Sequence, residues 1–387
     1  MRMNSGKWAA GLALLIFLSL GASRARAIPP DPDNAALLYY QAFLSLAELD
    51  EGERTLIRAV AAGEADPNDR AREYVRKCGA AIGFAEAAAQ VRTCNWGFRF
   101  SQGFDALMPH LAQVRFLNFV LVADARIRAA DGDYRGALQR GLLIGTLARQ
   151  VGDDTLVSYL VSIALRRSEG RCMIEVVGKA SGDASLLRWL KDELAASPQW
   201  KLTPVRPLKI EMEIALDAMQ VGKLETLVRI AAEDEQKRAE IRKMAGEDVL
   251  AKGRAMYSQR LSSMIRILGS SMPYEQAHAQ LEPLGSGFDP NDPSSALAGL
   301  MVPAISRVHT LGARSEAYVN AARAGIEICL QKAESGKLPT TLPAGLPKDP
   351  FSGQDFRYER TDDGFILRCQ GKDLDKDVME GFKFVVK

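Results

Sequence analysis

Apolar residues recur at helical spacing through the middle of the chain, and this regularity restricts the fold more than any other feature. Phe116, Val120 and Ala123 are spaced i, i+4 and i+7, which places them on one face of a helix. The pairs Gly132-Asp133 and Gly152-Asp153 then separate this segment from two more segments of the same kind. Long helices joined by such short turns pack as antiparallel hairpins, so we expect a stack of helical hairpins here.

The C-terminal residues differ from the centre, because four prolines between residues 339 and 350 exclude a helix there. Residues 356–360 and 365–369 flank Thr361–Gly364, whose glycine can take the positive φ of a hairpin turn, and residues 382–386 are typical of a third strand. Elsewhere Ala and Leu are abundant and aromatic residues make up only 7%, which favours helices. The sequence therefore predicts a mainly α fold of stacked antiparallel helical hairpins with a small C-terminal β-hairpin module.

Stretches rich in proline and glycine divide the chain into four segments. They are a signal peptide (1–27), a helical-hairpin domain (28–197), a long helical region that ends in a loop (198–295), and a helix followed by the small β module (296–387). Further helices are expected over three stretches: residues 69 to about 92, a tract after Pro207 to about Ser270, and about Ala296 to Ser335.

The N-terminus has the three parts of a signal peptide. Arg2 and Lys7 precede an apolar run, Trp8–Ala22, which is shorter than the ~20 residues of a membrane span. Ala25-Arg26-Ala27 then offers a small-x-small cleavage site. We expect export to the periplasm or the extracellular space with cleavage at this site. The alternative, favoured by the arginines beside it, is an uncleaved segment that anchors the protein in a membrane.

Charge and cysteine content narrow the choice of partners and of covalent links. The chain carries 50 basic and 48 acidic residues, and four basic ones lie in residues 1–27, so the mature count is 46 against 48. This balance argues against a nucleic-acid-binding protein, which would show a basic face. The five cysteines leave at least one without a partner inside the chain in an oxidising compartment, and we expect most of them to be buried.

Three alternating aspartates near the C-terminus, Asp373, Asp375 and Asp377, are the candidate metal ligands that the sequence indicates. Calcium takes about six to eight oxygens, which closely spaced Asp side chains and backbone carbonyls can supply. An EF-hand is excluded, because its sixth and twelfth positions would be Val378 and Phe384. A calcium site is one hypothesis for this loop, a solvated acidic turn is the simpler one, and no other cofactor is expected.

The sequence contains no catalytic motif, so no catalytic residue is assigned. The three histidines, His110, His278 and His309, lack the paired spacing of a zinc site, and nucleophile-elbow, P-loop and dinucleotide-binding patterns do not occur. Paired carboxylates need no sequence signature, so acid–base chemistry stays open. Trp96, with Asp105 nearby, could line a sugar-binding groove, but a buried tryptophan that closes a helix junction is the simpler expectation.

The C-terminal motifs resemble those of a known family. Asp349–Gly353, residues 356–358, residues 362–365 and Gly371–Asp373 are similar in order and spacing to the C-terminal head of type II secretion major pseudopilins. The resemblance implies a helix before a small sheet and an acidic loop that binds calcium. The chain lacks a prepilin cleavage site before its apolar run, so polymerisation as a pilin is not expected, and Leu374 stands where the family commonly has Gly.

Two further resemblances concern the helical stack and the chain as a whole. Gly132-Asp133-Tyr134 followed by Ala137 resembles the turn into the second helix of a tetratricopeptide repeat, so the stack is expected to be of that kind in part. Across the whole chain, residues 34–39, Cys94–Gly97, Met108–Leu111 and the motif Asp349–Gly353 resemble those of a set of exported helical proteins of planctomycete-type bacteria. That resemblance implies an architecture and carries no activity.

The leading functional hypothesis is an exported helical scaffold or binding protein of the cell envelope, without recognisable catalysis, that binds an envelope protein partner. The alternatives are a periplasmic hydrolase acting on envelope polymers and an accessory component of a secretion or pilus apparatus. No nucleic acid is expected as a partner, and a membrane only if the signal segment stays uncleaved. A deep cleft with two close carboxylates would favour the hydrolase, and a flat helical surface would favour the scaffold.

Overall fold

The computed structural model describes residues 31–152, 154–197, 202–231, 234–302 and 304–386. The chain divides into two compact units, Met1–Asp33 and Asn34–Lys387, and every helix and strand below belongs to the second. The structure confirms the predicted mainly α fold with a small C-terminal sheet. The predicted signal peptide lies outside the described residues, so its cleavage stays a prediction.

Four short helices begin this unit, and capping residues start three of them. Asn34, Asp50 and Asn68 each accept a backbone N–H through a side-chain oxygen, which satisfies a donor of the first turn. The single helix expected from residue 69 to about 92 is wrong, because the chain breaks at Cys78, directly before Gly79, a weak helix former. The helices are α2 (Ala35–Leu44), α3 (Glu51–Ala62), α4 (Asp69–Lys77) and α5 (Gly79–Ala89).

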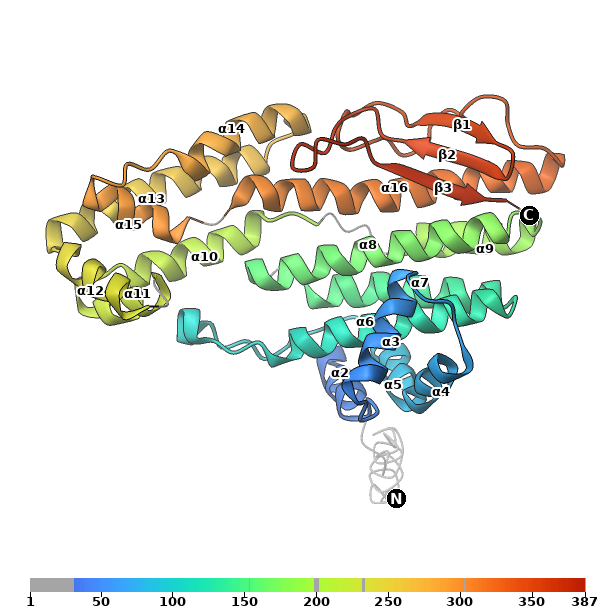
Figure 1. Cartoon of the computed structure of the whole chain (residues 1–387), viewed down its shortest axis with the longest axis horizontal. Coiled ribbons are helices and arrows are strands. Elements are labelled where there is room, and N and C mark those ends of the chain that lie inside the picture. Colours follow the sequence, from blue (N-terminus) through green and yellow to red (C-terminus); the bar gives the residue numbers. More distant parts are fainter. Residues whose placement is uncertain (1–30, 153, 198–201, 232–233, 303, 387) are drawn as a thin grey trace, which may run out of the picture. The chain divides into compact units, whose positions relative to one another are not determined.

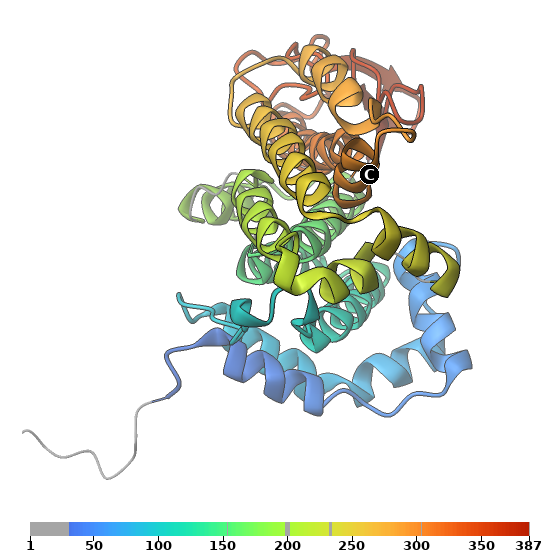
Figure 2. The same ribbon diagram turned by 90° about the vertical axis from the view of Figure 1, so that its left-hand side faces the viewer.

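Three long helices form the hairpin stack that the periodicity predicts, and they lie side by side in Figures 1 and 2. Phe116 and Ala123 are buried, in agreement with their spacing. Gly132 and Gly152 at the two turns have positive φ values of 83° and 73°, which glycine adopts without strain. The elements are η1 (Phe100–Asp105), α6 (Pro109–Ala130), α7 (Tyr134–Val151), α8 (Leu156–Lys179) and α9 (Ala184–Ala196).

The following helical region is more broken than the sequence indicates. The tract expected up to Ser270 is a series of shorter helices, one of which begins after Gly246, and an unpredicted helix follows it. The helix expected from Ala296 to Ser335 is two helices, the first ending at Met301 and the second beginning at Ile305, and the sequence has a proline between these two residues, which disfavours a continuous helix. The elements are α10 (Val205–Ala218), η2 (Val221–Lys223), α11 (Leu224–Ala231), α12 (Glu235–Met244), α13 (Glu247–Leu268), α14 (Tyr274–Ser286), α15 (Pro293–Met301) and α16 (Ile305–Ser335).

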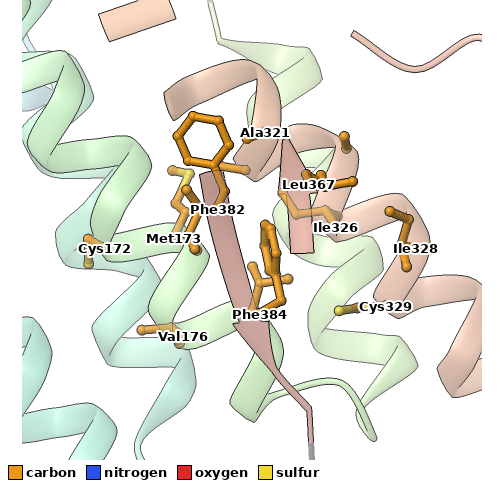
Figure 3. Close-up of a cluster of buried hydrophobic side chains, with 14 of the residues drawn as sticks. Cys172, Met173, Val176, Ala321, Ile326, Ile328, Cys329, Leu367, Phe382 and Phe384 are labelled. Atoms are coloured by element: carbon orange, nitrogen blue, oxygen red, sulfur yellow. The ribbon is translucent and has the colours of Figure 1, made fainter. Parts of the chain in front are cut away.

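The C-terminal module is a three-stranded antiparallel sheet in the order β1-β2-β3. Figure 3 shows Phe382 and Phe384 of the third strand between side chains of α8 and α16. The third strand lies close to both helices because Gly178 of α8 and Gly325 of α16 face it. A Cβ at Gly178 would overlap Val385, and a Cβ at Gly325 would overlap Phe384. The strands are β1 (Arg357–Thr361), β2 (Gly364–Arg368) and β3 (Gly381–Val385).

Three clusters of buried apolar side chains hold Asn34–Lys387 together, and α8 contributes to all of them. The first joins α8, α9 and α16 to the sheet, and the second joins the N-terminal helices to α6 and α7. The third joins α10 to α15 to the beginnings of α8 and α16. The C-terminal module therefore shares a core with the helical stack and caps it.

Two observations concern the cysteines and the longest apolar stretch of the chain. The cysteine prediction is confirmed, since all five thiols are free and four of them are buried. Among the described residues, one stretch, Pro293–Ser335, is long and apolar enough to cross a membrane. It comprises α15 and α16, and apolar side chains of these helices pack in the first and third clusters.

Candidate functional site

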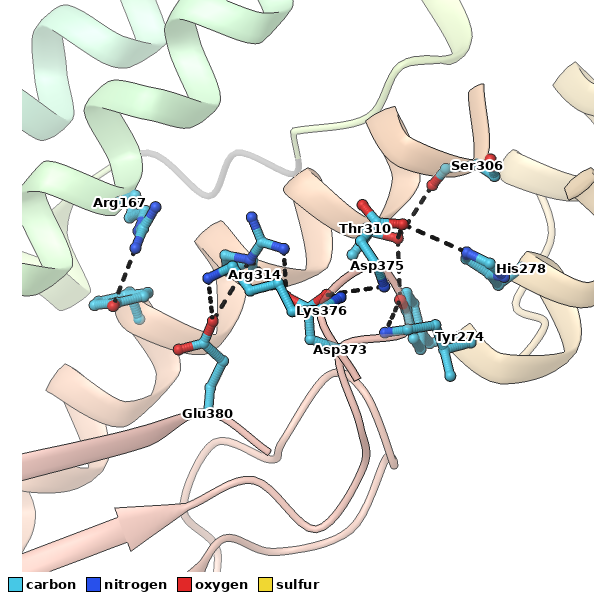
Figure 4. Close-up of polar contacts among 12 residues, drawn as sticks. Arg167, Tyr274, His278, Ser306, Thr310, Arg314, Asp373, Asp375, Lys376 and Glu380 are labelled. Carbon is cyan, nitrogen blue, oxygen red and sulfur yellow. Dashed lines mark hydrogen bonds and ion pairs between the residues drawn. The ribbon is translucent and has the colours of Figure 1, made fainter. Parts of the chain in front are cut away.

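Asp373, the first of the predicted metal ligands, anchors the loop between β2 and β3 on α16 (Figure 4). Its side chain is fully buried, and its carboxylate accepts a hydrogen bond from Nε of Arg314 at 2.6 Å. The backbone N–H of Asp375 donates to the same carboxylate at 3.1 Å, and Glu380 lies 3.5 Å from the guanidinium of Arg314. This aspartate is therefore neutralised by a protein cation.

The other two aspartates have separate partners. Asp375 accepts a hydrogen bond from the hydroxyl of Thr310 at 3.3 Å and lies 3.7 Å from Nε2 of His278. Asp377 is exposed and pairs with Lys372 at 2.8 Å. Across the part of the chain that the structure describes, no group of three or more His, Cys, Asp or Glu side chains is placed to hold a metal ion. Calcium binding stays a prediction, and it would require the buried aspartate to leave its arginine.

Trp96 has the structural role that was the simpler expectation. It is buried, its ring stacks on His110 with centroids 4.6 Å apart, and its Nε1 donates to the backbone carbonyl of Gln150 at 2.8 Å. Asp105 does not join it, because that carboxylate pairs with Arg229 at 2.7 Å. The tryptophan thus closes the junction between the N-terminal helices and the stack.

The strongest candidate site is a cavity of ≈ 410 Å³ between α7, α8 and α16. Its volume lies in the range of about 300–1,000 Å³ that is usual for small-molecule pockets. The end of α9, residues 202–204 and the segment before α14 complete its walls. The cavity therefore depends on elements that lie far apart in the sequence.

Three arginines from three helices line this cavity: Arg149 of α7, Arg166 of α8 and Arg323 of α16. Arg166 donates to the carboxylate of Glu169 at 2.6 Å. No carboxylate of the described ranges forms an ion pair with Arg149 or Arg323, and Nε of Arg323 is buried without a hydrogen-bond acceptor. Two guanidinium groups in the cavity therefore form no ion pair with a carboxylate of the described residues, although Glu169 lies near enough to act on both.

Glu169 lies beside these arginines, which form the charged end of the cavity, and it is buried, with only 3% of its surface exposed. A Cβ at Gly145 of α7 would lie 2.6 Å from its Cδ, so the absence of a side chain there leaves room for the carboxyl. Burial raises the pKa of the Glu169 carboxyl, and Arg166, Arg323 and Arg149 oppose that effect. Burial, followed by the nearby Arg166, lowers the pKa of the Arg323 guanidinium. These charges lie where water screens them little.

The other end of the cavity is aromatic and is formed by Tyr159 of α8, Tyr274 of α14 and His309 of α16. Tyr159 lies opposite Gly312, where a Cβ would be 2.8 Å from its phenolic oxygen. The ring of Tyr274 stacks on His309 with centroids 5.2 Å apart, and Figure 4 shows its hydroxyl at Thr310, a hydrogen bond of 3.0 Å. Burial lowers the pKa of His309, so its ring is uncharged at neutral pH.

Sequence reasoning missed this site. The lining residues of α7 and α16 follow helical spacing on the faces that meet at the cavity. They are Gly145 and Arg149 on α7, and Glu316, Val319 and Arg323 on α16. The sequence does not say which helix faces will meet, because tertiary packing decides that. Comparisons with family models, curated proteins and solved structures found no match to this chain, so its own geometry carries the interpretation.

Proposed function

We propose that this protein is an exported binding protein of the cell envelope that holds a small organic anion in the cavity between α7, α8 and α16. One observation carries the proposal: Arg149 and Arg323 come from different helices, line one cavity, and form no ion pair within the described part of the chain. Export is the sequence-based part of the proposal and rests on the signal-peptide pattern of residues 1–27.

An anion in the cavity would relieve an unfavourable arrangement of charge. Guanidinium groups stay protonated in proteins, and like charges in one partly buried site disfavour each other. A carboxylate or phosphate accepts two parallel hydrogen bonds from a guanidinium, which compensates the charge with defined geometry. The three lining arginines outnumber the two lining glutamates, Glu169 and Glu316, so the cavity favours an anion over a cation.

This arrangement supports binding better than hydrolysis. Acid–base hydrolysis needs carboxyl groups that can exchange protons with the substrate. Glu169 is buried and hydrogen-bonded to Arg166, while Glu316 is exposed. An envelope protein partner and a role in a secretion or pilus apparatus stay predictions. The role in a secretion or pilus apparatus rests on the C-terminal module, and this module is packed into the same core as the helices.

Calorimetric titration of the purified protein with benzoate, phenyl phosphate and the neutral analogue benzamide tests the proposal. We expect one or both anions to bind and benzamide to bind at least about tenfold more weakly, because a hydrogen bond to a charged group contributes about 1.5–3 kcal/mol. The variant Arg149→Gln/Arg323→Gln should lose most anion binding.

The control is Arg115→Gln, which removes one exposed positive charge on α6 outside the cavity. It should bind the anions as the unchanged protein does. Equal binding of benzamide and benzoate, or undiminished anion binding in the double arginine variant, would refute the proposed function.

A further inference from the structure

The cavity has a charged end and an apolar end, and their separation constrains the shape of a ligand. Tyr159 and Arg166 lie seven residues apart on α8, which is roughly 10 Å along the helix axis. His309 and Arg323 lie 14 residues apart on α16, roughly 21 Å along its axis. A molecule that contacts both ends must be elongated.

We infer that the ligand is an amphiphilic carboxylate, with one oxyanion bound at Arg149 and Arg323 and an apolar body that extends toward Tyr159 and Tyr274. The inference rests on the proposed function and adds the chemical class of the ligand. It combines two features of one cavity: the guanidinium groups that form no ion pair within the described residues, and the aromatic wall.

The aromatic end offers the rings of Tyr159, Tyr274 and His309 to the apolar body of a ligand. The hydroxyl of Tyr274 is engaged by Thr310 at 3.0 Å and by the backbone N–H of Leu374 at 3.3 Å, so its ring is what remains for a ligand. Ile163 and Met272 add apolar lining on either side. A hydrocarbon or aromatic body placed here leaves water without losing hydrogen bonds, which is favourable.

Two alternative ligand classes fit the same cavity less well. An inorganic phosphate would fill a small part of ≈ 410 Å³ and leave the aromatic end in contact with water. A polyanion such as a nucleoside triphosphate would bring its extra charges close to Glu316 and Glu169, and like charges repel in a site of low dielectric. A single anionic group matches the small excess of positive charge.

Titration with acetate, butyrate, hexanoate and octanoate, beside octanol and inorganic phosphate, tests the inference. We expect affinity to rise about threefold to fourfold per added methylene until the apolar end is filled, which is the usual effect of methylene burial. Octanoate should bind at least about tenfold more tightly than octanol, because octanol cannot accept charge-assisted hydrogen bonds.

Two variants separate the ends of the cavity. Met272→Ser, in the segment before α14, should weaken octanoate binding several-fold and leave acetate unchanged. Arg149→Gln/Arg323→Gln should weaken both carboxylates by the same factor. Equal affinities of acetate and octanoate, or tighter binding of phosphate than of octanoate, would overturn the amphiphile inference and leave the proposed function standing. Octanol binding as tightly as octanoate, or no anion binding at all, would overturn both.

Discussion

The close approach of α7 and α8 at Gly145 gives a prediction that tests the charged end of the cavity. Gly145→Ala adds a Cβ that would lie 2.6 Å from Cδ of Glu169, whose carboxyl is buried and accepts a hydrogen bond from Arg166 at 2.6 Å. Either the carboxyl turns away from its arginine or the two helices separate. Both responses lower the stability of the folded protein.

Two opposing effects set the expected change in the free energy of unfolding. Overpacking a buried site costs about 1–3 kcal/mol, while alanine is about 1 kcal/mol better than glycine inside a helix, so Gly145→Ala should lower the free energy of unfolding by about 1 kcal/mol. Gly83 of α5 provides the matched control, because nothing lies within 4 Å of the Cβ that would be added there. Gly83→Ala should raise the free energy of unfolding by about 1 kcal/mol.

Urea denaturation followed by far-UV circular dichroism measures both changes. The decisive comparison places Gly145→Ala in a Glu169→Ala background, where no carboxyl remains to be displaced. In that background the substitution should be stabilising by about 1 kcal/mol. If Gly145→Ala is equally destabilising in both backgrounds, the glycine does not accommodate this carboxyl and the account of the charged end is wrong.

Two further predictions concern buried polar and thiol groups. Arg314→Met leaves the fully buried carboxylate of Asp373 without its cation and should lower the free energy of unfolding by about 3–5 kcal/mol in the same urea assay. Adding Asp373→Leu should restore most of that loss, and an unrestored double variant would contradict the pairing. Burial raises the pKa of Cys172 and of Cys329 to about 12, so iodoacetamide at about pH 8 should modify both thiols only after unfolding. Mass spectrometry that finds either one alkylated in the folded protein would refute their burial.

Sequence reasoning succeeded where the signal is local and failed where packing overrides it. The long helices of the stack and the C-terminal hairpin follow from apolar spacing and turn chemistry. The helix α14 does not follow from such local signals, because Pro283 disfavours a helix at its position. The helix nevertheless continues to Ser286, and Tyr274, Ala277 and Leu281 are buried on it at helical spacing. Their packing outweighs the hydrogen bond that the proline cannot donate.

The cavity could not be predicted, because its three arginines are ordinary members of a set of 50 basic residues until the helices pack. One local signal was available. Leu165, Glu169, Cys172 and Val176 of α8 are spaced i, i+4, i+7 and i+11 and are all buried, so the glutamate occupies a core position in an otherwise apolar row. A buried acid at such a position requires a nearby cation, and this would have directed attention to Arg166.

The most direct test of the anion-binding proposal is a crystal structure of the protein with 4-bromobenzoate, in which the anomalous signal of bromine locates the ligand. We expect the carboxylate within hydrogen-bonding distance of Arg149 or Arg323 and the bromine on the side of Tyr159 and Tyr274. Bromine outside the cavity between α7, α8 and α16, or a carboxylate that contacts neither arginine, would contradict the proposal.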